Sequence, residues 1–160
     1  MALVPGGNRQ KGHDGEREIV KLLQPIVELV LGEKKLQRNL QQTRQGGHDI
    51  CGLEHLAIEV KRCETLEIEK WWKQTLRQAA MLGGDAIPVL LFRQNRGKWR
   101  VMMYGRIGLM TCRVEIDMLT FGLWLEEDLK TRVARGEIQA RSGFYPDDGG
   151  LAGEGKEIAA

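Results

Sequence analysis

The sequence predicts an α/β domain in which a mixed β-sheet is flanked by helices. Apolar residues recur at every third and fourth position over residues 14–31, 68–82 and 117–134, and this spacing predicts amphipathic helices. Short apolar runs bounded by glycine-rich or polar turns lie between these segments and predict strands. The expected order is α-β-β-β-α-β-β, followed by a terminal helix.

The composition is that of a soluble protein of one domain. The 160 residues are 42% hydrophobic and 29% charged, without an apolar run near eighteen residues or a signal-peptide pattern. We therefore expect neither a membrane span nor secretion. The three cysteines lack CxxC spacing, which argues against a disulfide framework or a zinc site and fits the reducing cytoplasm. The formal net charge is +2, and because the segment after residue 140 is net acidic, the rest leans toward an anionic partner.

Changes in composition along the chain predict three parts. Residues 1–13 combine glycine and proline with basic side chains and read as a flexible basic arm, which either keeps the protein soluble or contacts phosphate. Residues 14–136 are expected to form the folded domain, with a core over 14–104 and a C-terminal extension over 105–136. Residues 137–160 are rich in glycine and small or acidic residues and are expected to be disordered.

The first helix carries an acidic residue close to its apolar stripe. Asp14 is a plausible N-cap, and Pro25 is expected to kink the helix or split it in two. Glu16 falls near the edge of the stripe, whereas Glu18 falls well off it. Glu16 therefore either needs a partner or a cation, or is a first-turn glutamate that the helix dipole favours.

The stretch from Gly47 to Lys61 organises the prediction of function. Asp49 begins one short apolar run and Glu59 lies near the end of a second, so the two runs read as adjacent strands of a tight hairpin. Side chains alternate along a strand, so Glu59 and Lys61 face the same way about 6.6 Å apart. In register, Asp49 meets Glu59 across the ladder. Two carboxylates beside an ammonium form a place for a hard divalent cation.

The segments around this stretch predict the rest of the sheet. Residues 34–44 read as an exposed strand, and the glycines that follow allow either a plain turn or the close approach of a ligand. Residues 86–92 are a buried strand in which Pro88 indicates a sheet edge or a pairing gap. Residues 98–104 complete a hairpin, and 111–116 give a further strand.

Two later helices carry aromatic residues. The apolar stripe of the helix over 68–82 comprises Ile68, Trp72, Leu76, Ala79 and Ala80, with Trp71, Gln74 and Gln78 on a flanking face. The helix over 117–134 presents Phe121, Trp124, Leu125 and Leu129 at helical spacing, which predicts packing against the core or against a second subunit.

With these positions placed, the chain resembles the PD-(D/E)XK nucleases, and among them most closely the archaeal-type Holliday junction resolvases. The likeness covers roughly residues 12–104 and is carried by residues 15–23, 48–50, 58–61, 83–84, 87–90 and 98–100. His48 replaces the proline that precedes the first acid in the superfamily's pattern. The serine-rich DNA-contacting loop of that family corresponds here to residues 43–47.

The resemblance implies a restriction-endonuclease-like core with an extra C-terminal helix and a metal-dependent active site. Glu16, Asp49, Glu59 and Lys61 are the implied catalytic residues. Asp49 and Glu59 would hold Mg²⁺, for which Mn²⁺ is a plausible substitute, with help from the Val60 carbonyl. Glu16 would hold a second metal through water. For Lys61 we favour orientation of water and charge balance over proton abstraction.

The resemblance also implies branched or double-stranded DNA as the partner and a C2 homodimer that makes two symmetric nicks. Trp71 and Trp72 either stack on exposed bases or belong to the core. Either of two amides, Gln74 or Gln78, is the superfamily's helix glutamine. Each basic side chain of the expected DNA surface is alternatively part of a solvated face. The residues expected to contact DNA are Lys34, Lys35, Arg38, Arg44, Gln45, Arg62, Lys73, Gln74, Arg77 and Gln78.

Three other functions fit parts of the pattern. The first is a nicking, flap-cutting or restriction-like endonuclease with the same chemistry and another substrate. The second is a non-catalytic DNA-binding subunit, against which the joint presence of Glu16, Asp49, Glu59 and Lys61 argues. The third is an interaction domain that uses the helix of Trp124 and binds no metal.

Overall fold

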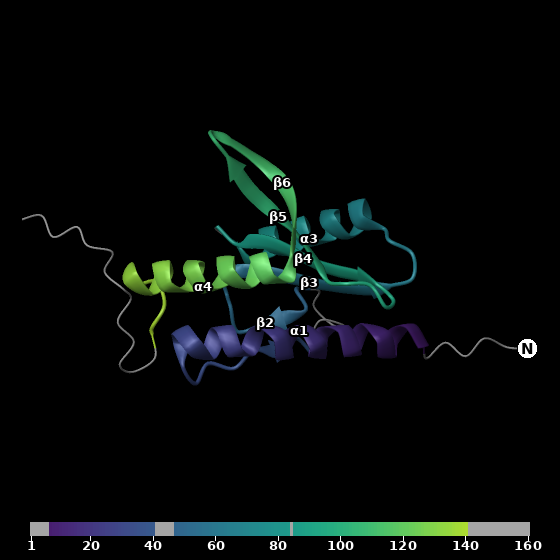
Figure 1. The fold of residues 1–160 in the computed structure, drawn as a ribbon, viewed down its shortest axis with the longest axis horizontal. Helices are drawn as coiled ribbons and strands as arrows, with labels where there is room; N and C mark the ends of the chain where they lie inside the picture. Colours follow the sequence, from purple (N-terminus) through teal and green to yellow (C-terminus); the bar gives the residue numbers. More distant parts are fainter. Residues whose placement is uncertain (1–6, 41–46, 84, 141–160) are drawn as a thin grey trace, which may run out of the picture.

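A four-stranded mixed sheet forms the centre of the protein in the computed structural model, which describes residues 7–40, 47–83 and 85–140 (Figure 1). The strands lie in the order β3-β4-β5-β6, with β3 parallel to β4 and the other neighbours antiparallel. A separate antiparallel pair, β1 and β2, lies beside β3. The strands are β1 Gln37–Arg38, β2 Ile50–Cys51, β3 Leu56–Cys63, β4 Ile87–Gln94, β5 Arg100–Ile107 and β6 Met110–Asp117.

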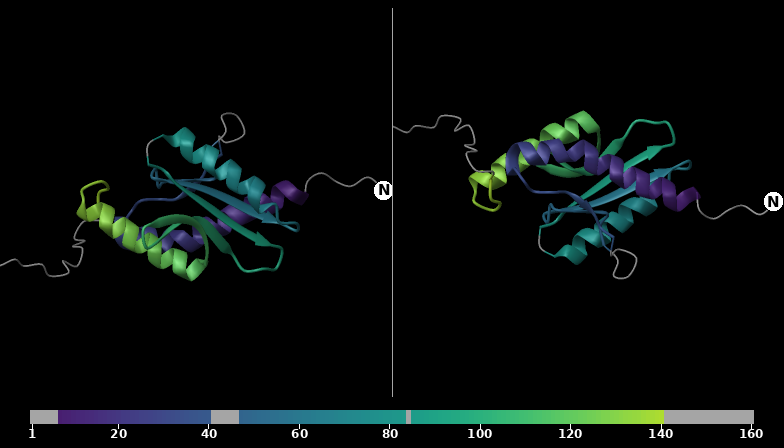
Figure 2. Two further views of the ribbon diagram at one scale, coloured as in Figure 1. Left: turned by 90° about the horizontal axis from the view of Figure 1, so that it is seen from above. Right: turned by 90° about the horizontal axis from the view of Figure 1, so that it is seen from below.

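Helices cover both faces of the sheet (Figure 2). The helices α1 (Gly7–Leu31) and α4 (Met118–Ala134) pack together on one face. The helix α3 (Ile68–Leu82) covers the other face and connects the parallel strands β3 and β4. This arrangement confirms the predicted fold class, a mixed sheet flanked by helices with an additional C-terminal helix. None of the described helices is long and apolar enough to cross a membrane.

The apolar residues separate into two clusters, one for each face of the sheet. The larger cluster joins α1 and α4 to the sheet and includes Ile19, Leu23, Phe121, Ile58 and Val60. The smaller cluster joins α3 to the sheet and consists of Trp71, Trp72, Leu90, Phe92 and Met102. Because side chains alternate along β3, the residues next to Ile58 and Val60 point to the face that α3 covers.

The first helix is longer than the sequence predicted. It begins at Gly7, so residues 7–13 are helical where a flexible arm was expected. It also continues through Pro25 as one helix, so the predicted split at this proline is wrong. Leu23 and Val27, on either side of this exposed proline, are fully buried in one cluster. Their burial offsets the backbone hydrogen bond that a proline inside a helix cannot make.

The predicted hairpin between the runs of Asp49 and Glu59 is wrong in its strand pairing. β2 pairs with β1, and the ladder partner of β3 is β4. The expected strand over 34–44 is reduced, among its described residues, to Gln37 and Arg38. One backbone bond still joins the two runs, because Asp49 N–H donates to the Ile58 carbonyl at 2.7 Å. Asp49, directly before β2, therefore lies along the open edge of β3.

The helix predicted over 68–82 has these bounds, but its buried side is turned relative to the predicted stripe. The buried residues are Trp71, Trp72, Thr75, Gln78 and Ala79, whereas Ala80 is exposed. The two buried polar side chains of this helix have backbone partners, because Gln78 donates to the Gly47 carbonyl and Thr75 donates to the Trp71 carbonyl one turn earlier in the helix.

Pro88 lies in an inner strand and not at an edge of the sheet. β4 has β3 on one side and β5 on the other. The ladder with β5 begins only at Val89, opposite Met103. Ile87 N–H donates to the His55 carbonyl, which lies directly before β3. Because successive amides along a strand point to opposite sides, an N–H at position 88 would point toward β5, whose ladder has not begun there. Pro88, which has no N–H to donate, therefore lies in a gap in the strand pairing, the second of the two possibilities predicted for it.

The hairpin of β5 and β6 extends beyond the rest of the sheet. β4 pairs with β5 only over residues 100–103, so residues 104–113, which we call the arm, form a two-stranded ribbon. Figure 1 shows the arm rising away from the body above α4. At its tip Ile107 faces Met110, and Gly108 adopts a positive φ of 60°. A two-residue hairpin turn needs this conformation at its first central position, and Leu109 completes it.

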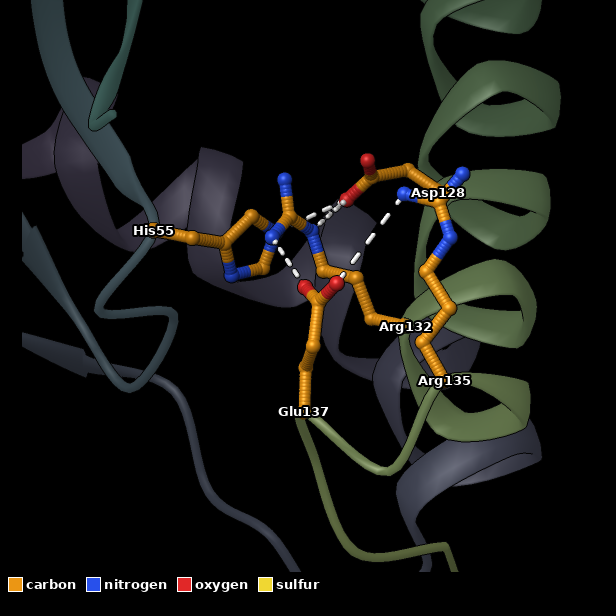
Figure 3. A network of polar contacts seen from close by, with 5 residues as sticks. All are labelled: His55, Asp128, Arg132, Arg135 and Glu137. Carbon is orange, nitrogen blue, oxygen red and sulfur yellow. Dashed lines mark hydrogen bonds and ion pairs between the residues drawn. The ribbon is translucent and has the colours of Figure 1, made fainter.

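The last helix is fixed at both ends by side chains. Asp117 is its N-cap and accepts a hydrogen bond from Thr120 N–H at 2.8 Å. Near its other end, Asp128 Oδ2 lies 2.8 Å from His55 Nε2 and accepts from Arg132 Nε at 2.9 Å (Figure 3). Glu137 accepts from Arg132 Nη1 at 2.8 Å. The network ties the loop before β3 to α4.

The Asp128→Asn substitution tests this network. Burial opposes ionisation of Asp128, but hydrogen bonds from His55 and Arg132 outweigh it and hold its pKa below the usual value. A lowered carboxylate pKa stabilises the fold above the unfolded pKa, near 4, and this stabilisation is lost as the pH falls through the folded value. We expect the substitution to cost about 1–3 kcal/mol at pH 7 and much less at pH 3.

Urea unfolding at both pH values measures the difference. Glu127→Gln is the matched control, because Glu127 is the exposed neighbour on the same helix and pairs only with Lys130 among the described residues. Its cost is expected to stay within about 0.5 kcal/mol at both pH values. An Asp128→Asn cost that does not change with pH would show that the charge of Asp128 is not what holds the network.

Candidate active site

Asp49 lies at the open edge of β3 and is held there by three hydrogen bonds. Its N–H donates to Ile58 at 2.7 Å, and its carbonyl accepts from Asn39 N–H at 2.8 Å. Its side-chain Oδ2 accepts from Val60 N–H at 2.6 Å. The carboxylate is buried, with 4% of the residue exposed. The backbone of β3 thus fixes the direction in which Asp49 presents its other oxygen.

Glu59 is the most buried acidic residue that the structure describes, with no exposed surface. It lies on β3 beneath α3, and the same oxygen, Oε1, contacts the Lys61 ammonium and accepts from Gln74 Nε2 at 2.7 Å. The other oxygen, Oε2, is buried without a hydrogen-bond partner in the described part of the chain. The expectation that Glu59 and Lys61 face the same way agrees with this contact.

The buried carboxylates act on each other. Burial, and after it the negative charge of Glu59, raise the pKa of Asp49 to about 7. The hydrogen bond from Val60 N–H and the positive charge of Lys61 lower the pKa of Asp49, whereas the negative charge of Glu16 raises it further. Because this pKa is close to 7, Asp49 is only partly ionised near neutral pH, which limits the negative charge that the two carboxylates place beside Lys61.

Glu16 reaches the neighbourhood of this pair from α1 but has a partner of its own. Arg38 Nε, on β1, donates to Glu16 Oε2 at 2.6 Å, and both side chains are largely buried. Glu16 was predicted to point toward the core side and to need a partner or a cation. Arg38 supplies that partner, although the sequence placed Arg38 among the residues that contact DNA.

The donor atoms suit a hard divalent cation, although they do not form a complete cage. Among the described residues no group of three His, Cys, Asp or Glu side chains is close enough to hold a metal. The buried Oε2 atom of Glu59 nevertheless lacks a donor, and a cation is the kind of partner that compensates a buried carboxylate oxygen. Asp49 and Glu59 therefore fit one metal ion whose other ligands come from backbone, water or substrate.

The residues expected to contact DNA are dispersed. Lys73 and Arg77 are exposed on α3 and form no ion pair with a described residue, and they lie on the helix beside the face of Gln74 and Gln78. Gln78 Nε2 donates to the Gly47 carbonyl at 2.8 Å. Between the two candidate glutamines, only Gln74 bonds to a predicted catalytic residue.

Other members of that set lie elsewhere. Lys34 pairs with Glu54, and Lys35 pairs with Glu28 at 3.2 Å. Arg62 alternates with Lys61 along β3 and packs near Gly15 of α1, on the opposite face of the sheet from Glu59 and Lys61. Arg44 and Gln45 lie outside the described residues.

Two residues that lie at the site, Asn39 and His48, were not among the predicted site residues. Asn39 Nδ2 donates to the His48 carbonyl at 3.0 Å and, with its backbone, holds the segment that delivers Asp49. His48 is itself partly buried, and burial lowers its pKa against the opposing influence of Glu59 and Glu54. Its position directly before the first acid was the available signal, whereas nothing local in the sequence distinguishes Asn39.

Comparison with known proteins identifies the family. No curated protein and no solved structure shows a significant match to the chain. A family model described as "Phage putative PDDEXK endonuclease" matches residues 7–110, which include α1, the β3 strand of Glu59 and Lys61, α3 and most of the sheet. The match supports the PD-(D/E)XK superfamily and does not extend to the archaeal resolvase subtype. The chain belongs to this phage family of PD-(D/E)XK endonucleases and is a nuclease.

Proposed function

We propose that the protein is a Mg²⁺-dependent endonuclease that selects branched DNA and cuts four-way junctions by paired nicks, with Mn²⁺ as a substitute metal. The observation that supports it best is the buried pair of Asp49 and Glu59 beside Lys61, with one Glu59 oxygen that lacks a partner. It would act in the cytoplasm on intermediates of DNA recombination and repair.

Asp49, Glu59 and Gln74 would have different roles in binding a cation. Asp49 and Glu59 would bind it through carboxylate oxygens, with the Val60 carbonyl as a further ligand. A bound divalent cation supplies Lewis-acid stabilisation of the phosphoryl oxygens and lowers the pKa of water. Gln74 holds Glu59 Oε1 at 2.7 Å, so the orientation that leaves Oε2 available is fixed before a cation arrives.

Lys61 places a positive charge at the centre of the site. Its ammonium contacts Glu59 Oε1, and its side chain keeps partial access to solvent. A cation so placed can orient water and balance the charge that develops on the phosphate in the transition state. This geometry supports orientation and electrostatic stabilisation as the role of Lys61.

Glu16 would hold a second metal through water only after its bond to Arg38 opens. The 2.6 Å contact uses Glu16 Oε2, and Arg38 is held in β1. DNA phosphate is a competing acceptor for the Arg38 guanidinium. We therefore propose that substrate binding draws Arg38 toward phosphate, which restores the DNA-contacting role expected for it and frees Glu16.

The choice of a junction as substrate rests on the resemblance of the active-site residues to the archaeal-type resolvases. Basic residues on α3, with Lys73 and Arg77 exposed, would grip phosphates without reading bases, so selectivity would follow the shape of the DNA. Paired nicks require two sites, and a C2 homodimer supplies them. A nicking, flap-cutting or restriction-like endonuclease is the second candidate, because the same site chemistry serves each of these substrates.

Cleavage of a labelled synthetic four-way junction, beside a matched linear duplex and a flap, tests the proposed activity. Symmetric nicks in the junction alone are expected with Mg²⁺, and no cleavage is expected with EDTA. Asp49→Asn and Lys61→Ala should each lower the cleavage rate at least a hundredfold, because they remove a metal ligand and the charge balance of the site.

Lys98→Ala and Glu127→Gln are the controls, because both residues are exposed and lie outside the site. Equal cutting of duplex or flap would keep the chemistry and replace the resolvase assignment with a general endonuclease. Junction binding without cleavage under either Mg²⁺ or Mn²⁺ would contradict the catalytic proposal.

Stability measured against pH tests the metal site without any cleavage. Because the folded pKa of Asp49, about 7, is above its ordinary value near 4, ionisation of this carboxyl opposes folding. The metal-free protein should lose stability between pH 5 and pH 8, by an amount on the order of 3 kcal/mol. Asp49→Asn should show less of this loss.

Adding Mg²⁺ or Ca²⁺ at pH 8 should restore stability to the wild-type protein and leave Asp49→Asn unchanged, because only the wild type gains a ligand that prefers the folded state. Thermal unfolding followed by circular dichroism gives both readings. A melting temperature that Mg²⁺ raises equally in the two proteins would show that the cation binds elsewhere.

Charge removal on α3 tests the DNA surface. Lys73→Ala combined with Arg77→Ala should weaken junction binding several-fold and reduce the slope of log K against log salt by about 2, because each lost phosphate contact removes about 0.9 from that slope. Fluorescence anisotropy at several salt concentrations, with Ca²⁺ in place of Mg²⁺, measures both quantities. The control combines Lys21→Ala with Arg135→Ala, which removes the same charge from α1 and from the end of α4. An identical slope in both double variants would rule out α3 as the contact surface.

A further inference from the structure

The arm has one apolar face, and the distal half of that face is uncovered. By alternation along β5, Ile107 lies on the same side as Met103 and Val101, which are buried in the cluster of α1 and α4. Met110 lies opposite Ile107 and shares this side. The exposed fractions are 63% for Ile107, 61% for Met110 and 93% for Leu109 at the turn. A two-stranded ribbon gains little stability alone, so an exposed apolar face on it indicates a partner.

An apolar cleft lies at the base of the arm. Its volume is about 770 Å³, and it opens between the start of β4, the hairpin of β5 and β6, and α4. Met103, Val114 and Ile116 line it from the hairpin, and Trp124 lines it from α4. On α4, Leu119 and Leu123 extend the apolar surface beyond the cleft and are 75% and 59% exposed. The same chain thus carries an apolar projection and an apolar hollow.

We propose that the arm tip of one copy docks into the cleft of a second copy, and that the second arm docks reciprocally, so that two chains form a C2 dimer across the arms and α4. A surface that is complementary to another part of the same chain produces a closed pair under two-fold symmetry. The tip residues Ile107, Leu109 and Met110 would meet the cleft residues of the partner.

Charge complementarity favours this occupant. Arg106 of the arm and Asp85 at the start of β4 both line the cleft, and neither forms an ion pair with any residue in the described ranges. In the exchanged arrangement, Arg106 of one copy faces Asp85 of the other, and each such pair occurs twice.

The size of the surface also fits a second copy. The cleft, the tip and the exposed leucines of α4 comprise eighteen residues, just below the roughly twenty to thirty that each partner contributes to an interface of standard size. The inference builds on the proposed function, because it locates the interface of the C2 homodimer that paired nicks require, but it does not depend on the chemistry of the active site.

Sedimentation equilibrium of the full chain tests the dimer. The wild-type mass should be twice the 18.1 kDa of one chain at micromolar concentration. Leu109→Glu should raise the dissociation constant at least tenfold, and the 93% exposure of Leu109 means that this substitution removes no packing within the chain. Met81→Glu is the matched control, because Met81 is an exposed apolar residue of α3 away from the cleft, and its mass should stay that of the dimer.

A charge exchange identifies the contact itself. Arg106→Asp and Asp85→Arg should each weaken the dimer, and the chain that carries both substitutions should recover it, since every lost pair is replaced by its reverse. Amide hydrogen exchange should show protection over residues 107–110 that increases with protein concentration in the wild type.

The remaining outcomes overturn the proposal. A wild-type chain that is monomeric at all concentrations excludes the dimer. A dimer that Leu109→Glu does not weaken uses another surface. A dimer lost on truncation after Ala140 assigns the cleft to residues 141–160, and protection of residues 107–110 that depends only on added DNA assigns the arm to nucleic acid. Junction cleavage is scored separately, so failure of the dimer leaves the test of the nuclease site intact.

Discussion

Burial of the Glu59 carboxylate is the constraint to which the surrounding structure responds. An ionised group without exposed surface needs donors or cations around it, and here Lys61 and Gln74 both serve a single oxygen. This requirement explains why Gln74 of α3 faces the sheet, where an apolar stripe alone would have turned it outward. The neighbouring Asp49 ionises with difficulty because it is itself buried and, second, because the negative charge of Glu59 lies nearby.

The two faces of β3 have different roles: one packs in the apolar core and the other carries the polar candidate site. On one face Ile58 and Val60 join the large apolar cluster with α1 and α4. On the other face Glu59 and Lys61 form the polar site under α3. Because successive side chains alternate, one eight-residue strand contributes to both, and a shift of its register by one residue would exchange them. The long parallel ladder with β4 fixes that register.

The pattern of the sequence predicted the parts of the structure that depend on interactions between residues close together in the chain. The bounds of α3, the extent of α4 and the shared face of Glu59 and Lys61 all follow from periodicity within a few residues. The pairing of β2 with β1 could not be predicted in the same way, because strands of two residues carry too little pattern to choose a partner. The bond between Arg38 and Glu16 depends on that pairing, so the sequence assigned Arg38 to a solvent-facing role.

Asp49 also covers part of the free edge of the sheet. β3 is the terminal strand of the order β3-β4-β5-β6, and its free side would ordinarily present unpaired amides and carbonyls to any passing chain. Asp49 covers this side twice, since its backbone takes the Ile58 carbonyl and its carboxylate takes the Val60 amide. The residue that we propose as a metal ligand therefore also protects the strand against the addition of foreign strands. One carboxylate would thus serve both the proposed metal site and the protection of the sheet edge.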